Sequence, residues 1–193
     1  VAIVVSPAQY PLVLEELRSK GEISHETRNR LAVEAFETTA AYDAAIYSYL
    51  YRTYVNEPFP RTLIPVFRKQ LELRYGENPY QRGCFYGEAR TLSEPSITTA
   101  KQLHGKQLSY NNILDANDTL EMVKDFDRPT AAAVKHTNPC GIASADDVLT
   151  AYKRAVAVDP LSIYGGIVAV NRPMTLDVAL ELKPIFLEVV VAP

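Results

Sequence analysis

The chain has 193 residues, of which 47% are hydrophobic and 22% are charged, and its formal net charge is −3. These values are ordinary for a soluble globular protein of one domain or two small ones. The sequence contains no basic block and no apolar run near the roughly 20 residues that span a bilayer. We therefore expect no nucleic acid and no membrane among its partners.

The cysteines and the first residue indicate the cellular context. Cys84 and Cys140 lie far apart, which suits reduced thiols in a cytoplasmic protein rather than a disulfide framework. There is no signal-peptide pattern, and the chain begins with Val1 on a strand-like run instead of a methionine. We therefore expect an internal piece of a longer protein.

Residues 1–60 predict a strand, two helices and a linker. Residues 1–5 are typical of a buried strand, and a helix with Gly21 as its left-handed stop should follow. Residues 24–52 predict one long helix, in which six residues recur at spacings of four and three and form a packing seam. The seam residues are Leu31, Ala35, Thr38, Tyr42, Ala45 and Tyr49. Three prolines within residues 56–65 predict the linker.

Residues 66–75 predict a strand that presents Leu71, Leu73 and Tyr75 on one face. Arg74 would then point to the other face and need a partner of its own. A guanidinium suits bidentate binding of phosphate, although a salt bridge within a sheet is the commoner use of such an arginine.

The next stretch predicts one more strand and a helix. Residues 97–103 are strand-like, and residues 104–112 form a polar loop that leads to a helix starting after Asp115. Asn111 and Asn112, at the end of this loop, are typical of helix capping.

The most informative stretch is a small apolar run, residues 131–134, that ends in a cluster of reactive side chains. It predicts a buried strand that opens into a catalytic loop, where ligands gather in α/β folds. Lys135 and His136 can share one pocket only if the strand ends between them, and Pro139 and Gly141 favour such a break. A neighbouring ammonium would keep the imidazole neutral, so His136 suits a general base and Lys135 an electrostatic stabiliser.

A zinc site is the main alternative at this position. Zinc deaminases carry a Pro-Cys-x-x-Cys sequence and a glutamate two residues after the metal-binding histidine. Here Pro139-Cys140 is followed by no second cysteine at that spacing, and Asn138 stands two residues after His136. The sequence therefore disfavours zinc, but it leaves a deaminase-like enzyme open.

The remaining sequence predicts a helix over residues 144–158, a loop and strand over 162–170, a helix over 176–182 and a final strand over 186–191. Glu188 interrupts the last apolar run, and a carboxylate in a buried strand needs a partner. Alternating strands and helices indicate an α/β fold.

Five stretches in a fixed order carry a resemblance to a known family. They are the Lys-His-Thr-Asn-Pro-Cys-Gly sequence of residues 135–141 and the segments 73–79, 103–112, 159–166 and 186–193. Together they resemble the bifunctional purine biosynthesis proteins, which join AICAR transformylase to IMP cyclohydrolase. The resemblance implies that residues 1–60 are the C-terminal part of a small methylglyoxal-synthase-like cyclohydrolase domain plus a linker. Residues 61–193 would be the first half of a cytidine-deaminase-like transformylase domain.

The reaction that the resemblance implies is formyl transfer from 10-formyltetrahydrofolate to the amine of the AICAR nucleotide, in a cytoplasmic homodimer and without zinc. We assign His136 as the base and Lys135 as the transition-state stabiliser. The positions that match substrate-binding residues of the family are Arg74, Tyr75, Asn112, Gly165 and Glu188. The match at Glu188 is the softest, because aspartate also occurs there in the family.

The resemblance also limits what is expected of the chain itself. The cyclohydrolase residues of the family lie before Val1, and half of its transformylase substrate contacts fall after Pro193. We therefore assign no cyclohydrolase activity to this chain, and the isolated piece is expected to be weak or inactive. A chain that serves only for packing or dimerisation, through the seam on residues 24–52, is the remaining alternative.

Overall fold

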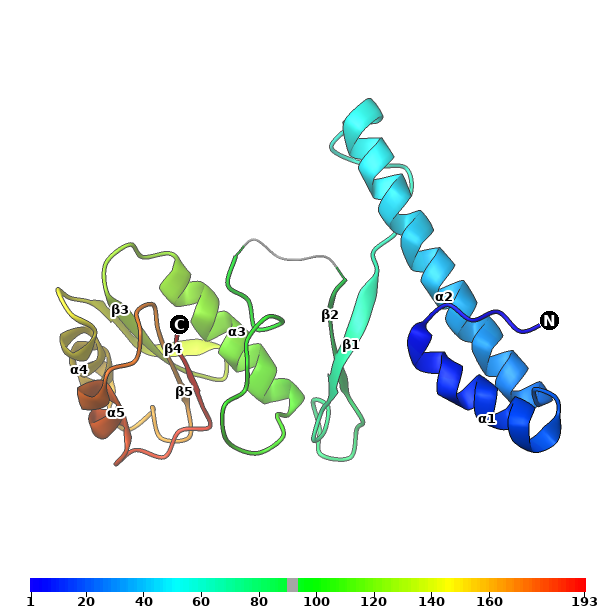
Figure 1. Ribbon diagram of the computed structural model, residues 1–193. Helices are drawn as coiled ribbons and strands as arrows, with labels where there is room; N and C mark the ends of the chain where they lie inside the picture. Colours follow the sequence, from blue (N-terminus) through cyan, green and yellow to red (C-terminus); the bar gives the residue numbers. More distant parts are fainter. Residues whose placement is uncertain (90–93) are drawn as a thin grey trace. The chain divides into compact units, whose positions relative to one another are not determined.

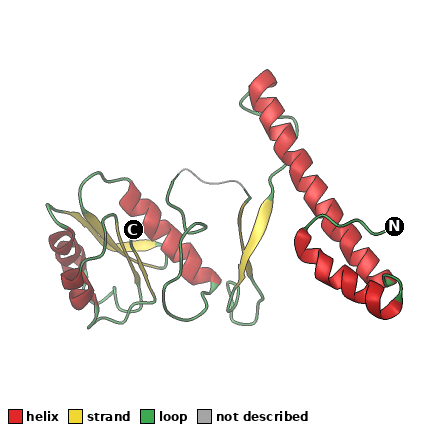
Figure 2. Ribbon diagram, in the orientation of Figure 1, coloured by secondary structure: helices red, strands yellow, loops and turns green. Residues whose placement is uncertain are grey.

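The computed structural model describes residues 1–89 and 94–193, which form two compact units, residues 1–66 and residues 67–193 (Figure 1). The first unit is helical, and the second combines helices with two sheets (Figure 2). The predicted α/β class is therefore confirmed at the level of a mixed fold.

Two long helices make up most of the first unit. Its elements are η1 (Pro7–Gln9), α1 (Tyr10–Lys20), α2 (His25–Leu50) and the π-helical turn η2 (Tyr51–Val55). Gly21 ends α1 with a left-handed φ of 74°, as predicted, and the Ser24 hydroxyl caps α2 by accepting the Thr27 amide at 3.2 Å. None of the described helices is both long and apolar enough to cross a membrane.

The predicted strand at residues 1–5 is wrong. No described segment pairs with it, and Val1 and Ile3 are exposed. An extended segment becomes a strand only when a neighbour accepts and donates its backbone hydrogen bonds, and the apolar pattern alone does not supply one.

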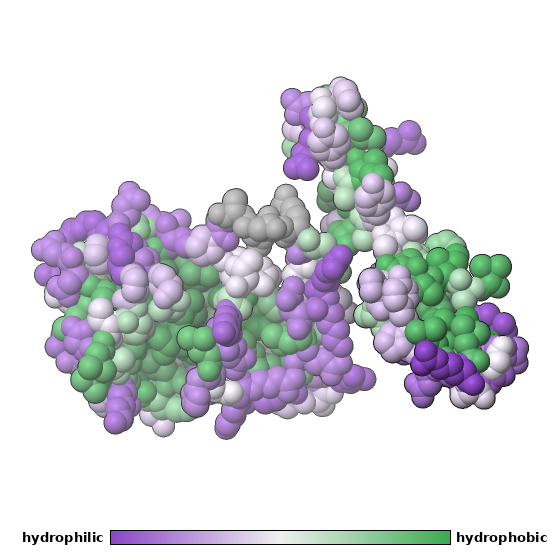
Figure 3. Space-filling model, in the orientation of Figure 1, coloured by the Kyte–Doolittle hydropathy of each residue, from purple (hydrophilic) through white to green (hydrophobic). Residues whose placement is uncertain are grey.

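The seam on α2 is buried only in its first half. Leu31 and Ala35 are buried, whereas Tyr42 and Tyr49 remain exposed, and Ala44 rather than Ala45 is buried further along the helix. Hydrophobic residues consequently lie open on the surface of this unit (Figure 3). The helical period was predicted correctly, but the burial of the whole seam was not.

The second unit contains a hairpin and a four-stranded sheet. Its elements are β1 (Phe67–Glu72), β2 (Cys84–Glu88), α3 (Tyr110–Lys124), β3 (Thr130–Lys135), β4 (Asn138–Ser144), α4 (Val148–Val158), β5 (Ile167–Val170), α5 (Leu176–Leu182) and β6 (Val189–Val191). Strands β1 and β2 pair with each other, and the larger sheet has the order β4-β3-β5-β6. Within this sheet β3 pairs antiparallel with both β4 and β5, whereas β5 and β6 run parallel.

The larger sheet is covered on both faces, by α3 on one side and by α4 and α5 on the other (Figure 1). The central strand β3 shows why. Ala131 and Ala133 belong to the cluster that contains the α4 and α5 residues, whereas Ala132 and Val134 pack with Val123 of α3. Successive side chains of a strand point to opposite faces, so a continuous run of small apolar residues lets helices approach from both sides.

Several predicted boundaries need correction. Residues 97–103 form a turn and coil, in which Thr99 donates its amide to the Ser96 carbonyl at 3.0 Å, and not a strand. Helix α3 begins at Tyr110, five residues before Asp115, and β6 is shorter than the predicted 186–191. Strands β2 and β4 were not predicted, since β4 opens with an Asn-Pro pair that is typical of a loop.

The apolar face of α4 is buried except at its end. Val148, Ala151, Tyr152 and Ala155 are buried, but Val158 is exposed. Val158 is the last residue of α4, so the apolar face of this helix is not buried along its whole length.

Candidate active site

The strand break predicted between Lys135 and His136 is confirmed. Strand β3 ends at Lys135, which pairs with Asn138 of β4, so His136 and Thr137 are the two central residues of a tight hairpin turn. Both have positive φ, 52° at His136 and 61° at Thr137. Hairpin turns of this kind usually carry Asn and Gly. The predicted open loop is therefore a turn with unusual residues.

The backbone of this turn is strained. Left-handed angles are costly for residues with a Cβ atom, most of all for a β-branched residue such as Thr137, at about 1 kcal/mol or more each. Two hydrogen bonds hold it from outside the strand pairing. The side-chain Nδ2 of Asn138 donates to the His136 carbonyl at 2.7 Å, and the backbone amide of Thr137 donates to Asp115 Oδ1 at 2.9 Å. The surrounding structure thus stabilises a backbone conformation that is intrinsically unfavourable for these two residues.

The two side chains predicted to be catalytic have different environments. Lys135 is half-buried, and its Nζ donates to the Tyr164 carbonyl at 2.8 Å. The His136 imidazole is exposed and makes no hydrogen bond to any residue that the structure describes. The ammonium is therefore fixed by the protein, whereas the imidazole is open to solvent.

Gly165 and Glu188 lie at the same edge of the sheet as Lys135. Because β3 runs antiparallel to β5, its end meets the beginnings of the parallel strands β5 and β6. Gly165 has a φ of 71° and donates its amide to the Phe186 carbonyl at 2.8 Å, while the Glu188 amide donates to the Gly166 carbonyl at 2.9 Å. This edge therefore collects Lys135, His136, Gly165 and Glu188.

The prediction that Glu188 lies in a buried strand is wrong. Glu188 precedes β6 and is exposed. Water can solvate a carboxylate at this position, so it needs no buried partner, and it remains accessible to a ligand.

Arg74 and Tyr75 form a stacked pair. The Arg74 guanidinium lies 4.9 Å from the centre of the Tyr75 ring, and its Nη2 is 3.3 Å from the Tyr75 hydroxyl. The alternation predicted for the strand holds for exposure, since Arg74 is exposed and Tyr75 is half-buried. However, the guanidinium folds back over its neighbour instead of pointing away from it, as cation–π attraction favours.

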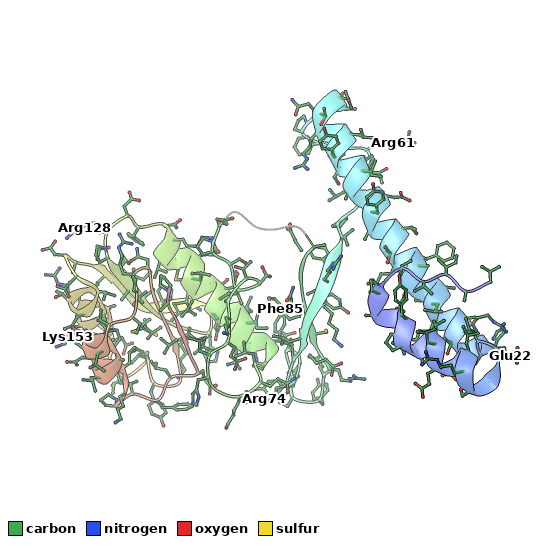
Figure 4. All side chains as sticks on the ribbon, in the orientation of Figure 1. Glu22, Arg61, Arg74, Phe85, Arg128 and Lys153 are labelled. Carbon is green, nitrogen blue, oxygen red and sulfur yellow. The ribbon has the colours of Figure 1, made fainter. Side chains whose placement is uncertain are left out.

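The stacked pair is attached to the beginning of α3. The Arg74 amide donates to the Leu108 carbonyl at 2.8 Å, and the Tyr110 amide donates to the Tyr75 carbonyl at 3.1 Å. Figure 4 shows Arg74 beside the end of α3 at which that helix begins. The hairpin and α3 thus hold the guanidinium at a defined place.

Asn112 has the capping role that is ordinary for asparagine. It is the third residue of α3, and its Oδ1 accepts the Ser109 amide at 3.0 Å and the Ser109 hydroxyl at 2.9 Å. The Ser109 hydroxyl in turn accepts the Asn112 amide at 3.2 Å, which completes a capping box. The side-chain nitrogen of Asn112 makes no hydrogen bond to the described residues, so only that end is available to a ligand.

The predicted site residues therefore fall into two groups that α3 connects. Arg74, Tyr75 and Asn112 lie around the start of the helix, and the turn at 136–137 is bonded to the helix through Asp115. The importance of Asp115 was missed because the helix was predicted to start after it. Because α3 begins at Tyr110, both Asn112 and Asp115 are in the helix. Residues three apart share a face of a helix, so Asp115 lies beside Asn112.

The thiol nearest to this site is a poor ligand or nucleophile. Cys140 of β4 is half-buried and packs against the core cluster beneath α4. Burial raises the pKa of the Cys140 thiol, and the Asp159 carboxylate raises it further against the opposing effect of Lys135. Within residues 1–89 and 94–193, no three His, Cys, Asp or Glu side chains are grouped so that they could hold a metal ion.

Comparison with known proteins gives a consistent result. The sequence pattern of a family described as AICARFT/IMPCHase bienzyme matches residues 1–193. Proteins named bifunctional purine biosynthesis protein PurH are 48% identical in Acetivibrio thermocellus, 50% in Ruminiclostridium cellulolyticum and 51% in Anoxybacillus flavithermus. Each alignment covers 100% of this chain and 37% of the relative. The chain thus spans little more than a third of the length of these relatives.

Proposed function

Because the chain belongs to the AICARFT/IMPCHase bienzyme family, we propose that residues 67–193 supply the catalytic pair for formyl transfer from 10-formyltetrahydrofolate to the amine of AICAR. The observation that carries the proposal is the strained turn. It presents an exposed imidazole next to a lysine whose ammonium is tied to the protein. Strained backbone of this kind clusters at active sites, where neighbouring structure maintains it.

The chemistry assigns one task to each side chain. The exocyclic amine is a weak nucleophile, so a base must take its proton as nitrogen attacks the formyl carbon, and His136 is available for this. The formyl oxygen gains negative charge when the new C–N bond forms, and the Lys135 ammonium offsets that charge. When the bond to the folate nitrogen breaks, that nitrogen takes up a proton, which the protonated His136 can return.

The nucleotide-binding part of the proposal involves the remaining predicted residues. The Arg74 guanidinium is exposed and pre-oriented on Tyr75, which suits a phosphate or another planar anion. The free end of the Asn112 amide, the backbone at Gly165 and the exposed Glu188 carboxylate would supply neutral and acidic contacts to the base and ribose. This division places anionic recognition at the start of α3 and the reacting amine at the sheet edge.

The architecture and setting of the whole protein complete the proposal. Residues 1–60 would belong to the end of a methylglyoxal-synthase-like IMP cyclohydrolase domain and its linker, and residues 61–193 to a cytidine-deaminase-like transformylase domain. The full-length protein would be a cytoplasmic homodimer that also closes the ring to IMP. The relatives named PurH are described as bifunctional, which supports the pairing of the two activities.

The test is His136→Ala in a full-length family member that carries this chain. Formyl transfer should fall by roughly a hundredfold or more, because general-base catalysis contributes about that much, while AICAR affinity stays nearly unchanged. His25→Ala is the matched control, since His25 lies on α2 in the other unit. Turnover of His136→Ala within about twofold of the parent would exclude the assigned role.

A further inference from the structure

We propose that Asp115 is a positioning residue, which holds the turn of His136 and Thr137 in its strained form and thereby sets the direction of the imidazole. This inference depends on the proposed function for its catalytic meaning. Its structural basis is the hydrogen bond from the Thr137 amide to Asp115 Oδ1, at 2.9 Å, which links the turn to α3.

The Thr137 amide needs such a partner. In a two-residue hairpin the amides of the two central residues do not take part in the strand pairing, and here pairing resumes at Lys135 and Asn138. Thr137 is half-buried, so its amide has limited access to water. A carboxylate forms a charge-assisted bond that is stronger than a bond to a neutral acceptor.

The bond matters because the turn is not stable by itself. Positive φ at both His136 and Thr137 disfavours this backbone, and a turn released from Asp115 has other conformations of lower local energy. A change of φ at either residue rotates the Cα–Cβ bond of His136 relative to Lys135. Loss of the anchor should therefore misplace the imidazole without unfolding the sheet.

Asp115 is itself held in place. It lies in the second turn of α3, next to the buried Ala116, and its carbonyl accepts the hydroxyl of the fully buried Thr119. The same helix is bonded at its start to the backbone of Tyr75 through Tyr110. Asp115 consequently ties the position of the base to the element that carries the proposed nucleotide contacts.

The experiment compares Asp115→Ala with Asp115→Asn and with Asp118→Ala in the full-length protein. Asp118 is on the same helix, has similar half-burial and makes no hydrogen bond or ion pair with the described residues. Hydrogen exchange of a peptide spanning residues 135–139 should rise in Asp115→Ala and stay unchanged in Asp118→Ala. Asp115→Asn, whose amide oxygen can still accept a hydrogen bond, should lie between them.

The loss of turnover should follow the same order as the rise in hydrogen exchange. We expect kcat of Asp115→Ala to fall by at least about tenfold, because small misplacements of catalytic groups cost that much, with KM for AICAR within about twofold. Thr137→Gly provides the second readout, because glycine accepts positive φ without strain. In that background the loss caused by Asp115→Ala should be clearly smaller.

Three results would overturn the inference. They are unchanged exchange at 135–139, a kcat loss of equal size with and without Thr137→Gly, and an equal loss in Asp118→Ala. If Asp115→Ala does not fold, Asp115→Asn and its exchange decide the question. Failure of the proposed function is recognised separately, since His136→Ala would then keep its turnover whatever the exchange experiment gives.

Discussion

Residues 67–193 and residues 1–66 use apolar side chains in different ways. In the second unit the central strands β3 and β5 are buried on both faces, and alanine and valine side chains there are at most 1% exposed. In the first unit only Leu31, Ala35 and Ala44 are buried apolar residues, whereas Phe36 is 75% exposed. The first unit therefore buries few apolar side chains, and the second is a layered fold with its own core.

The difference explains where a site can be built. A strained turn needs rigid neighbours on several sides, and the turn at 136–137 has β3, β4 and α3. On α2, by contrast, Tyr42 and Tyr49 are 67% and 60% exposed, and such rings suit packing at a surface. All the residues proposed for chemistry or binding accordingly lie in residues 67–193, and α2 is left with a packing role.

The largest expected effect is a loss of folding in the second unit from Gly141→Ala. A Cβ at Gly141 would lie 2.0 Å from the Ala155 carbonyl oxygen of α4. This oxygen belongs to the helix backbone, so it cannot move away as a flexible side chain could. We expect a loss of roughly 3 kcal/mol or more in the free energy of unfolding, measured by urea denaturation. Gly87→Ala is the control, because the closest contact of its Cβ would be the terminal nitrogen of the flexible Gln70 side chain, and it should cost less than about 1 kcal/mol. Equal losses of unfolding free energy in the two variants would mean that β4 and α4 are less tightly packed at Gly141 than the structure shows.

Leu31→Ala should produce a smaller loss, confined to the first unit. Leu31 is 1% exposed and is the largest fully buried side chain of that unit, so its truncation should cost about 2–3 kcal/mol. Hydrogen exchange should accelerate in α1 and α2 but not in β3. The control is Val33→Ala on the same helix, which is 68% exposed and should change stability by less than about 0.5 kcal/mol. Faster exchange in β3 would show that the two units are energetically coupled.

The smallest expected effect is the contribution of Glu16 to thermal stability, which should depend on pH. The Ser24 amide, donating to the Glu16 carboxylate at 2.9 Å, lowers the pKa of Glu16 from 4.5 to about 2, with help from Lys20. A lowered folded-state pKa stabilises the fold above the ordinary value, and the stabilisation is lost as the pH falls from 4.5 towards 2. The Tm difference between the parent and Glu16→Gln should thus be greatest above pH 4.5 and vanish near pH 2. A difference that does not depend on pH would contradict this.

The sequence was sufficient wherever the evidence is local. The burial of β3, the end of α1 at Gly21, the bounds of α5 and the break after Lys135 all depend on a few neighbouring residues, and they were predicted correctly. Strand identity was predicted poorly where it depends on distant partners. Residues 1–5 and 97–103 have strand-like composition but pair with no strand that the structure describes, whereas β4 has a neighbour despite its Asn-Pro opening.

The candidate site shows the same limit. Motifs pointed to Lys135, His136 and Arg74 because those side chains are chemically distinctive. They did not point to Asp115, whose part depends on a contact across 22 positions of sequence between a helix and a hairpin. The stacking of Arg74 on Tyr75 was also missed, since strand alternation describes where Cβ atoms point and not where a long side chain ends.

The turn at His136 and Thr137 has a practical consequence for protein engineering. A designer who optimises this hairpin for thermal stability would place Asn-Gly there, because that pair relieves the backbone penalty at both positions. Such a variant would gain stability by discarding the imidazole. Stabilising libraries built on this scaffold should therefore keep these two codons fixed and seek their improvements elsewhere.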